Sequence, residues 1–378
     1  MYRRARLAVI AIVLAAAAHA SPAGQAPPGA RQLYDRAIEL DRRGNPAAAL
    51  SLLWEAAGLA PQDGEIQHAL GSSLERIGAL NGAIDAYQAA VRSPRPPRGA
   101  SNSLVLALVK AGRSVDAIAH ARGLTAASAN DADGWFTLGL AQAEVDVEGA
   151  VDSFRRALAL DERHALARYN LALVFFRADR FQPAIEELTR ALAIQPRPEI
   201  HYTLGTAYRH LGEFDRAAAA LTDAVAANRD YADAYLALGT VYKAKGDLKR
   251  AASSLRRAAA LRPDLAAPHV VLAQTLSLER DEAGARRAAA EADRLRALFQ
   301  QSQEAATLTA AGAQQLDAGD AAAAADLFRR ATQAFDAFAP AHYQLGRALQ
   351  RLGQHDAAKA AFARAQQLNP ALVPPPGR

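Results

Sequence analysis

Cysteine is absent from the 378 residues of this sequence. Without thiols the chain can form neither a disulfide framework nor a thiolate zinc site, and it cannot carry a lipid anchor on an N-terminal cysteine. Glycine-rich phosphate loops, His-Glu-x-x-His and Gly-x-Ser-x-Gly are missing as well. We therefore expect no catalytic, cofactor or metal site, and an enzyme whose site carries no recognised motif remains a distant alternative.

Long blocks of like charge are also missing. The formal net charge is +5, but Arg3, Arg4 and Arg6 stand in a first segment of twenty residues that has no acid, so the rest of the chain is nearly balanced. A nucleic-acid partner would require a clustered basic surface. The charge pattern therefore predicts no nucleic-acid binding.

A long apolar run occurs at the N-terminus, from residue 7 to residue 18, directly after the three arginines. Ala18-His19-Ala20 then fits the small-x-small cleavage rule, which predicts a signal peptide over 1–20 and a mature start at Ser21. The run is short against the roughly 20 residues of a membrane span. We expect export to the periplasm or beyond; the alternative is an uncleaved anchor that holds residues 7–18 in the inner membrane. Residues 21–29 are predicted to be a flexible lead-in.

What the sequence does have is alanine, the strongest helix former, in a pattern that repeats every 33 or 34 residues apart from one longer step between the eighth and ninth copies. One copy reads Tyr235-x-x-Leu238-Gly239-x-x-Tyr242, followed by Gly246, Ala251, Leu255, Ala258 and Pro263. The same skeleton recurs at His201, Leu204, Gly205, Tyr208, Gly212, Ala217 and Leu221, and at His342, Leu345, Gly346, Leu349, Gly353, Ala358 and Phe362. This pattern resembles the tetratricopeptide repeat.

The resemblance implies an all-α fold, a right-handed superhelical solenoid of about ten helix-turn-helix units. Aligned units begin at about residues 30, 64, 98, 132, 165, 198, 232, 266, 305 and 339. We expect about eight units over 30–296, weakest near 98–131, where Ala121 stands at a position that usually holds a large residue. Residues 297–304 are predicted as a helical bridge, 305–370 as two further units, and 371–378 as a disordered tail.

In this family the first helix of each unit lines a concave groove, so the resemblance also implies a binding surface. The residues that map onto it are Phe136, Tyr169, Phe176, Arg177, Tyr202, Arg209, Leu236 and Lys243. Aromatic rings alternating with cations predict an extended peptide or protein segment with acidic groups, or an acidic glycan, as the ligand. The alternative is that the rings pack between helices and the cations favour helix C-termini. Of the family's carboxylate clamp for chaperone tails, Asn170 alone matches, which argues against that ligand.

These observations predict a non-catalytic scaffold or adaptor in the bacterial cell envelope. Subunits of polysaccharide export, pilus assembly or outer-membrane assembly machines are the rival hypotheses. Membrane contact is expected only through a partner or an uncleaved N-terminus. No extra polar helix follows Pro370, so the C-terminal end is predicted either to be soluble by itself or to dock on a partner or a second copy.

Some polar residues are assigned a structural role. His201, His269 and His342 share the repeat position of Trp135 and Tyr235, which predicts packing. His164, near a unit boundary, is expected to be solvated. Glu186 and Glu187 are expected on a solvated outer face.

Overall fold

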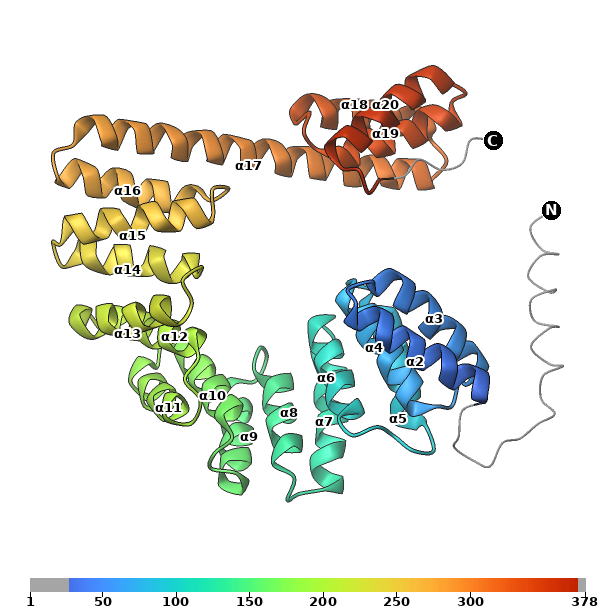
Figure 1. The fold of residues 1–378 in the computed structure, drawn as a ribbon, viewed down its shortest axis with the longest axis horizontal. Helices are drawn as coiled ribbons and strands as arrows, with labels where there is room; N and C mark the ends of the chain where they lie inside the picture. The colour runs from blue at the N-terminus through green and yellow to red at the C-terminus, as the bar shows by residue number, and fades with distance from the viewer. Residues whose placement is uncertain (1–26, 373–378) are drawn as a thin grey trace. The chain divides into compact units, whose positions relative to one another are not determined.

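The computed structural model describes residues 27–372 (Figure 1). The predicted signal peptide, most of the lead-in and all but two residues of the predicted tail lie outside the described residues. The first described helix begins at Pro28, two residues before the predicted start of the first unit at about residue 30. None of the helices within 27–372 has the length and apolar character needed to cross a membrane.

The described residues form 19 α-helices joined by short turns. In chain order they are α2 (Pro28–Arg42), α3 (Pro46–Leu59), α4 (Gly64–Arg76), α5 (Leu80–Arg92), α6 (Ala100–Lys110), α7 (Ser114–Ala127), α8 (Ala132–Gln142), α9 (Val147–Leu160), α10 (Ala165–Arg177), α11 (Phe181–Ile194), α12 (Pro198–His210), α13 (Phe214–Ala227), α14 (Ala232–Ala244), α15 (Leu248–Leu261), α16 (Ala266–Leu278), α17 (Glu282–Asp317), α18 (Ala321–Ala334), α19 (Ala339–Arg351) and α20 (His355–Leu368). The prediction of an all-α chain of about ten helix-turn-helix units is confirmed.

The turns between paired helices use a left-handed residue, as the glycine pattern predicts. Gly44, for example, has φ of +77° directly after α2, a conformation that glycine adopts without a steric penalty. The fifth and eighth units have no glycine there, and Asp179 and Arg280 take the same left-handed conformation with φ of 55° and 64°. The turn geometry is therefore kept in these two units, whereas the fourth unit has neither a glycine nor a left-handed residue between α8 and α9.

In several units a small residue on the first helix admits a large one from the second. A Cβ built on Gly139 of α8 would lie 2.6 Å from Phe154 of α9, which is fully buried. The third unit reverses this arrangement, because Val105 stands on α6 and Ala121 on α7, both fully buried. The weak repeat pattern near 98–131 therefore reflects a swap: in this unit the first helix carries the larger side chain and the second helix the smaller one.

The chain divides after Leu211 into two compact parts. The boundary falls between α12 and α13, inside the sixth predicted unit, and each part is described by itself. The hand of the predicted superhelix stays a prediction.

In the second part, α17 runs unbroken for 36 residues, a length of about 54 Å at 1.5 Å per residue. Its first half packs with α16 in a cluster that includes Leu255, Leu272 and Ala288. Its second half packs with α18 and α19 in clusters that include Leu316 and Phe328. The predicted bridge, 297–304, lies between these cores and contains no buried residue.

The last helix, α20, covers the end of the chain's core with a polar surface. Phe362 and Ala358 pack inward against α19, whereas His355, Asp356 and Lys359 are exposed. None of the large hydrophobic residues that are exposed within 27–372 belongs to α20.

Candidate binding surfaces

Two predicted ligand-groove aromatics pack mainly against other rings. The ring of Phe136, on α8, lies 5.9 Å from that of Phe154 and 4.8 Å from that of His164 between centroids. Phe176, on α10, lies 5.4 Å from Phe181 and 5.5 Å from His210. Both remain half-buried. The packing interpretation therefore describes these two residues, although each keeps an accessible edge.

The two tyrosines of the set stand on neighbouring first helices. The hydroxyl of Tyr169, on α10, lies 3.5 Å from the Thr203 hydroxyl of α12. Tyr202 also belongs to α12, and both tyrosines are half-buried. Both tyrosines lie in the first compact part. The contact between Tyr169 and Thr203 shows that their helices, α10 and α12, pack side by side.

Two of the three cations of the set, Arg177 and Lys243, have partners from neighbouring units. Arg177 is exposed, forms an ion pair with Glu144 and donates to the carbonyl of Ala143 at 2.8 Å. Lys243 donates to Gln274 Oε1 at 2.7 Å. These contacts tie the end of one first helix to the next, so both cations cross-link units in addition to favouring a helix C-terminus.

The remaining members separate between the two parts. Arg209 is half-buried, with Nη2 3.4 Å from His210 Nε2. Leu236 is half-buried against the cluster around Leu255 in the second part. The structure thus groups six of the predicted residues in residues 27–211 and two, Leu236 and Lys243, in residues 212–372.

A second surface lies on the outer face, which we define as the surface formed by the second helices. Between α9 and α11, above α10, a cavity of about 670 Å³ is lined by apolar and charged residues. Its floor includes Leu171 and Phe175, and Arg180 lies over the Phe175 ring at 4.7 Å. We call it the fifth-repeat pocket.

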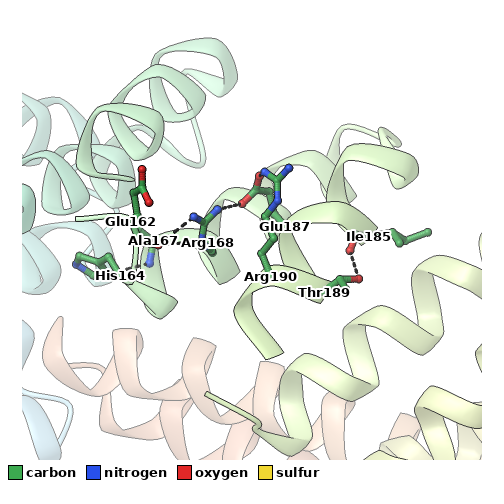
Figure 2. A network of polar contacts seen from close by, with 8 residues as sticks. All are labelled: Glu162, His164, Ala167, Arg168, Ile185, Glu187, Thr189 and Arg190. Atoms are coloured by element: carbon green, nitrogen blue, oxygen red, sulfur yellow. Dashed lines mark hydrogen bonds and ion pairs between the residues drawn. The ribbon is translucent and has the colours of Figure 1, made fainter. Parts of the chain in front are cut away.

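An ion network crosses this pocket (Figure 2). Arg168 Nη1 donates to Glu187 at 2.8 Å, and Arg190 Nη1 donates to the other carboxylate oxygen of Glu187 at 2.6 Å. Arg168 also donates from Nε and Nη2 to the carbonyl of Glu162, at 3.2 and 2.9 Å. The expectation that Glu187 is solvated was wrong: the residue is 9% exposed, and its charge is tolerated because both oxygens are paired.

His164, at the start of α10, corrects another expectation. Its side chain is 12% exposed, and Nδ1 accepts a hydrogen bond from the backbone N–H of Ala167 at 3.1 Å. The ring thus caps the N-terminus of α10 in the way that Asp or Ser usually does. His164 was expected to be solvated because it stands near a unit boundary. Its ring instead satisfies a helix N–H that would otherwise have no partner.

The fourth position of the repeat has a role that sequence reasoning missed. In four units the side chain there donates to the carbonyl six residues earlier, in the loop between units. Besides Arg168, the contacts are Gln67 to Pro61 at 3.1 Å, Trp135 to Ala129 at 2.9 Å, and His342 with Asp336 at 2.9 Å. For His342, at the position that it shares with Trp135, the sequence predicted packing alone. The signal was available, because all four side chain types can donate a hydrogen bond.

The third repeat contains the counterpart of the fifth-repeat pocket. A cavity of about 450 Å³ lies between α5 and α7, above α6. The two pockets are two repeat lengths apart in the sequence. Each residue that lines this pocket therefore has an equivalent 67 positions later; the equivalent of Arg113, for example, is Arg180. We call it the third-repeat pocket. His120 lines it, and burial lowers the pKa of His120 below its usual 6.5, which keeps the imidazole neutral at pH 7.

Metal binding finds no support in the part of the chain that the structure describes, where no three His, Asp or Glu side chains gather around a common point.

Comparison with protein families places the chain in one class. Two models, both described as tetratricopeptide repeat, match residues 34–99, 146–197 and 202–266 in one case and 339–372 in the other, together more than half of the chain. The protein therefore belongs to the tetratricopeptide-repeat family. No curated protein matches the sequence significantly.

Solved structures with a similar fold are distant in sequence. A tetratricopeptide repeat protein from Parabacteroides merdae is 17% identical, with 66% of this chain and 100% of that chain covered and a TM-score of 0.51. YrrB, described as a TPR protein with an unusual peptide-binding site, is 21% identical over 46% and 91% of the two chains, with a TM-score of 0.43. MamA from Desulfovibrio magneticus is 23% identical over 45% and 97%, with a TM-score of 0.39. The first of these supports the repeat fold.

Proposed function

We propose that the protein is a non-catalytic scaffold that binds protein segments along its first helices. The observation that carries the proposal is the pair of half-buried tyrosines, Tyr169 and Tyr202, on adjacent first helices of one compact part. Tyrosine combines a rigid apolar ring with a hydroxyl and is enriched where proteins bind one another tightly. Membership of the repeat family supports the same function, because a repeat array presents an extended surface rather than a closed cavity.

A peptide is a better ligand for this surface than an acidic glycan. An acidic polymer would need free cations along the groove, yet Arg177 is paired with Glu144 and Lys243 with Gln274. The Glu144 carboxylate offsets the charge of Arg177, so an acidic polymer would have to displace it, whereas Lys243 keeps its charge because the Gln274 amide is neutral. This favours a protein partner over direct binding of an exported polysaccharide.

The proposal also places the protein in the bacterial cell envelope. It rests on the three arginines, the apolar run 7–18 and the cleavage pattern before Ser21. Intact mass of protein isolated from its native cells tests this: we expect a chain that starts at Ser21 in the periplasmic fraction. A chain that keeps residues 1–20 in the membrane fraction would instead indicate the anchored form, and a full-length chain in the cytoplasm would refute export.

Binding is tested by affinity capture from the native envelope. The parent protein is compared with a variant carrying Tyr169→Ala, Arg177→Ala, Tyr202→Ala and Arg209→Ala, whose helicity is checked by circular dichroism. A matched control carries Arg155→Ala, Arg156→Ala and Glu186→Ala, three exposed residues of the second helices.

We expect a defined partner to be captured by the parent and by the control and to be lost from the quadruple variant. Capture of the same partner by all three proteins would rule out the first-helix surface as the binding site. Mass spectrometry of the captured protein then identifies the assembly in which the scaffold acts.

A further inference from the structure

The third- and fifth-repeat pockets have the same place in the repeat but different contents. In the fifth, Arg168, Glu187 and Arg190 cross the pocket with a paired ion network. The equivalent residues in the third repeat are Ser101, His120 and Gly123. Two long arginine side chains are thus replaced by a hydroxymethyl group and a hydrogen atom, so the Arg168–Glu187–Arg190 network has no equivalent in the third-repeat pocket.

The apolar floor of the third-repeat pocket is therefore bordered by separate polar side chains at its rim, and no Arg-Glu-Arg network bridges it. Leu104 and Leu108 of α6 and Val91 of α5 line the cavity. Its volume of about 450 Å³ lies within the roughly 300–1,000 Å³ typical of sites that hold compact ligands. A bulky apolar side chain has room to enter and would be removed from water there.

The polar residues at the rim favour a ligand that carries a negative charge next to that apolar side chain. Arg113 pairs with Asp116, Nε to carboxylate oxygen at 2.8 Å. The remaining charged residue of the lining is Arg92, at the end of α5. Gln88 and His120 add neutral polar groups. His120 Nε2 is inaccessible to solvent and has no hydrogen-bond partner among the described residues. The surplus charge at this rim is therefore positive.

We propose that the third-repeat pocket docks a peptide segment in which a bulky apolar residue is flanked by acidic residues. The apolar side chain enters between α5 and α7 and packs on Leu104 and Leu108, while a flanking carboxylate pairs with Arg92. This inference rests on the proposed scaffold function and adds a second contact surface, on the outer face. An extended partner would then be held at two places on the first compact part.

Fluorescence anisotropy with defined peptides tests the pocket. The probe is a fluorescein-labelled dodecapeptide with a central Leu-Phe pair flanked by Asp and Glu; one comparison peptide has Lys for every acid and another has Ser for Leu-Phe. The protein variants are Ala119→Phe, which fills the pocket from exposed α7 surface, and Arg92→Glu, which reverses the rim charge. The matched control is Glu186→Phe, the same repeat position in the fifth repeat.

We expect the acidic Leu-Phe peptide to bind the parent and the Glu186→Phe control equally. Ala119→Phe and Arg92→Glu should each weaken binding about tenfold or more, and both comparison peptides should bind at least tenfold more weakly. Raising the salt concentration should weaken the parent interaction as well, because exposed charges are screened.

Three results would overturn the inference: no binding of the acidic peptide, equal binding of the lysine peptide, or unchanged binding to Ala119→Phe with an unaltered circular dichroism spectrum. The same measurements distinguish failure of the pocket from failure of the proposed scaffold function. If the quadruple first-helix variant loses the peptide while Ala119→Phe keeps it, the scaffold function stands and the pocket is not its site. If Ala119→Phe alone loses it, the pocket is confirmed independently of the first helices.

Discussion

Glycines inside these helices do opposite things, depending on what faces them. A Cβ on Gly312, in α17, would lie 2.6 Å from Phe328 Cε1, whereas a Cβ on Gly58, in α3, would meet nothing within 4 Å. Glycine within a helix costs about 0.5–1 kcal/mol relative to alanine. At Gly312 that cost is offset by the close approach of two helices, and at Gly58 it is not.

Substitution by alanine should therefore have opposite effects at the two positions. Gly58→Ala is expected to stabilise the protein by about 0.5–1 kcal/mol. Gly312→Ala is expected to destabilise it by about 1–3 kcal/mol, because Phe328 has no free space into which to move. Urea unfolding followed by circular dichroism measures both, and stabilisation by Gly312→Ala would show that the helices can separate at little cost.

Histidine gives the protein a pH dependence whose sign follows from burial. Burial lowers the pKa of His68 below its usual 6.5, and Nε2 lies 3.0 Å from the Ser103 hydroxyl. As pH falls below about 6.5 the unfolded chain binds a proton that the folded protein resists, so stability is lost through that window. His68→Gln should therefore lose less stability than the parent between pH 7.5 and pH 5.5. Equal losses in urea midpoint would assign the pH dependence to other groups.

The fourth repeat position shows what a sequence reveals at residue scale and what it does not. Large side chains such as Trp135 and His342 share this position, and the sequence therefore predicted that it serves packing. Its role as a donor to the carbonyl six residues earlier joins Gln67, Trp135, Arg168 and His342, whose shapes have little in common. A hydrogen bond depends on where the acceptor stands in space, and that position becomes visible only once the loop is folded.

At the scale of elements, the Arg168–Glu187 pair joins α10 to α11 and, through Glu162, to the loop after α9. Glu187→Ala would leave Arg168, whose side chain is 15% exposed, without its carboxylate. We expect a loss of about 3 kcal/mol, at the low end for breaking a buried pair.

The neighbouring Glu186→Ala serves as the control for this substitution. Glu186 is exposed, so its removal should change stability by less than about 0.5 kcal/mol. Urea midpoints of the two variants measure the difference. Similar midpoints would mean that water replaces the missing carboxylate and that the network does not hold the elements together.

The same pair marks the limit of element prediction. Repeat spacing placed the helices, the turn glycines and the small-to-large contacts, because each repeats from unit to unit. The burial of Glu187 does not repeat: it arises because Arg168 and Arg190 both happen to reach it. The candidate site is less predictable than the fold for this reason. Phe136 and Phe176 are half covered by rings from neighbouring units, and Arg177 is held by Glu144, contacts that spacing alone does not specify.

At the scale of the molecule, the second part contains two cores separated by residues 297–304. The clusters around Leu255 and Phe328 share no described residue. In repeat proteins each unit is stabilised mainly by its neighbours, so damage to one core should stay local. Leu255→Ala is expected to cost about 2–5 kcal/mol and Phe328→Ala about 3–5 kcal/mol, each in its own core.

Hydrogen exchange followed by mass spectrometry locates these losses. Phe328→Ala should accelerate exchange in α18 and α19 and leave α14 and α15 near the parent rates, and Leu255→Ala should do the reverse. Acceleration of both regions by either variant would show that α17 couples the two cores into one cooperative unit.

The bridge within α17 also determines how the chain would respond to mechanical load. Tension applied across the second part passes through residues 297–304, where Phe299 is 65% exposed and no side chain is buried. Over these eight residues the helix's own hydrogen bonds resist extension without the help of a packed core. A pulled molecule would therefore yield first at this point and lengthen there, while the repeat cores on either side stay folded and keep whatever they hold.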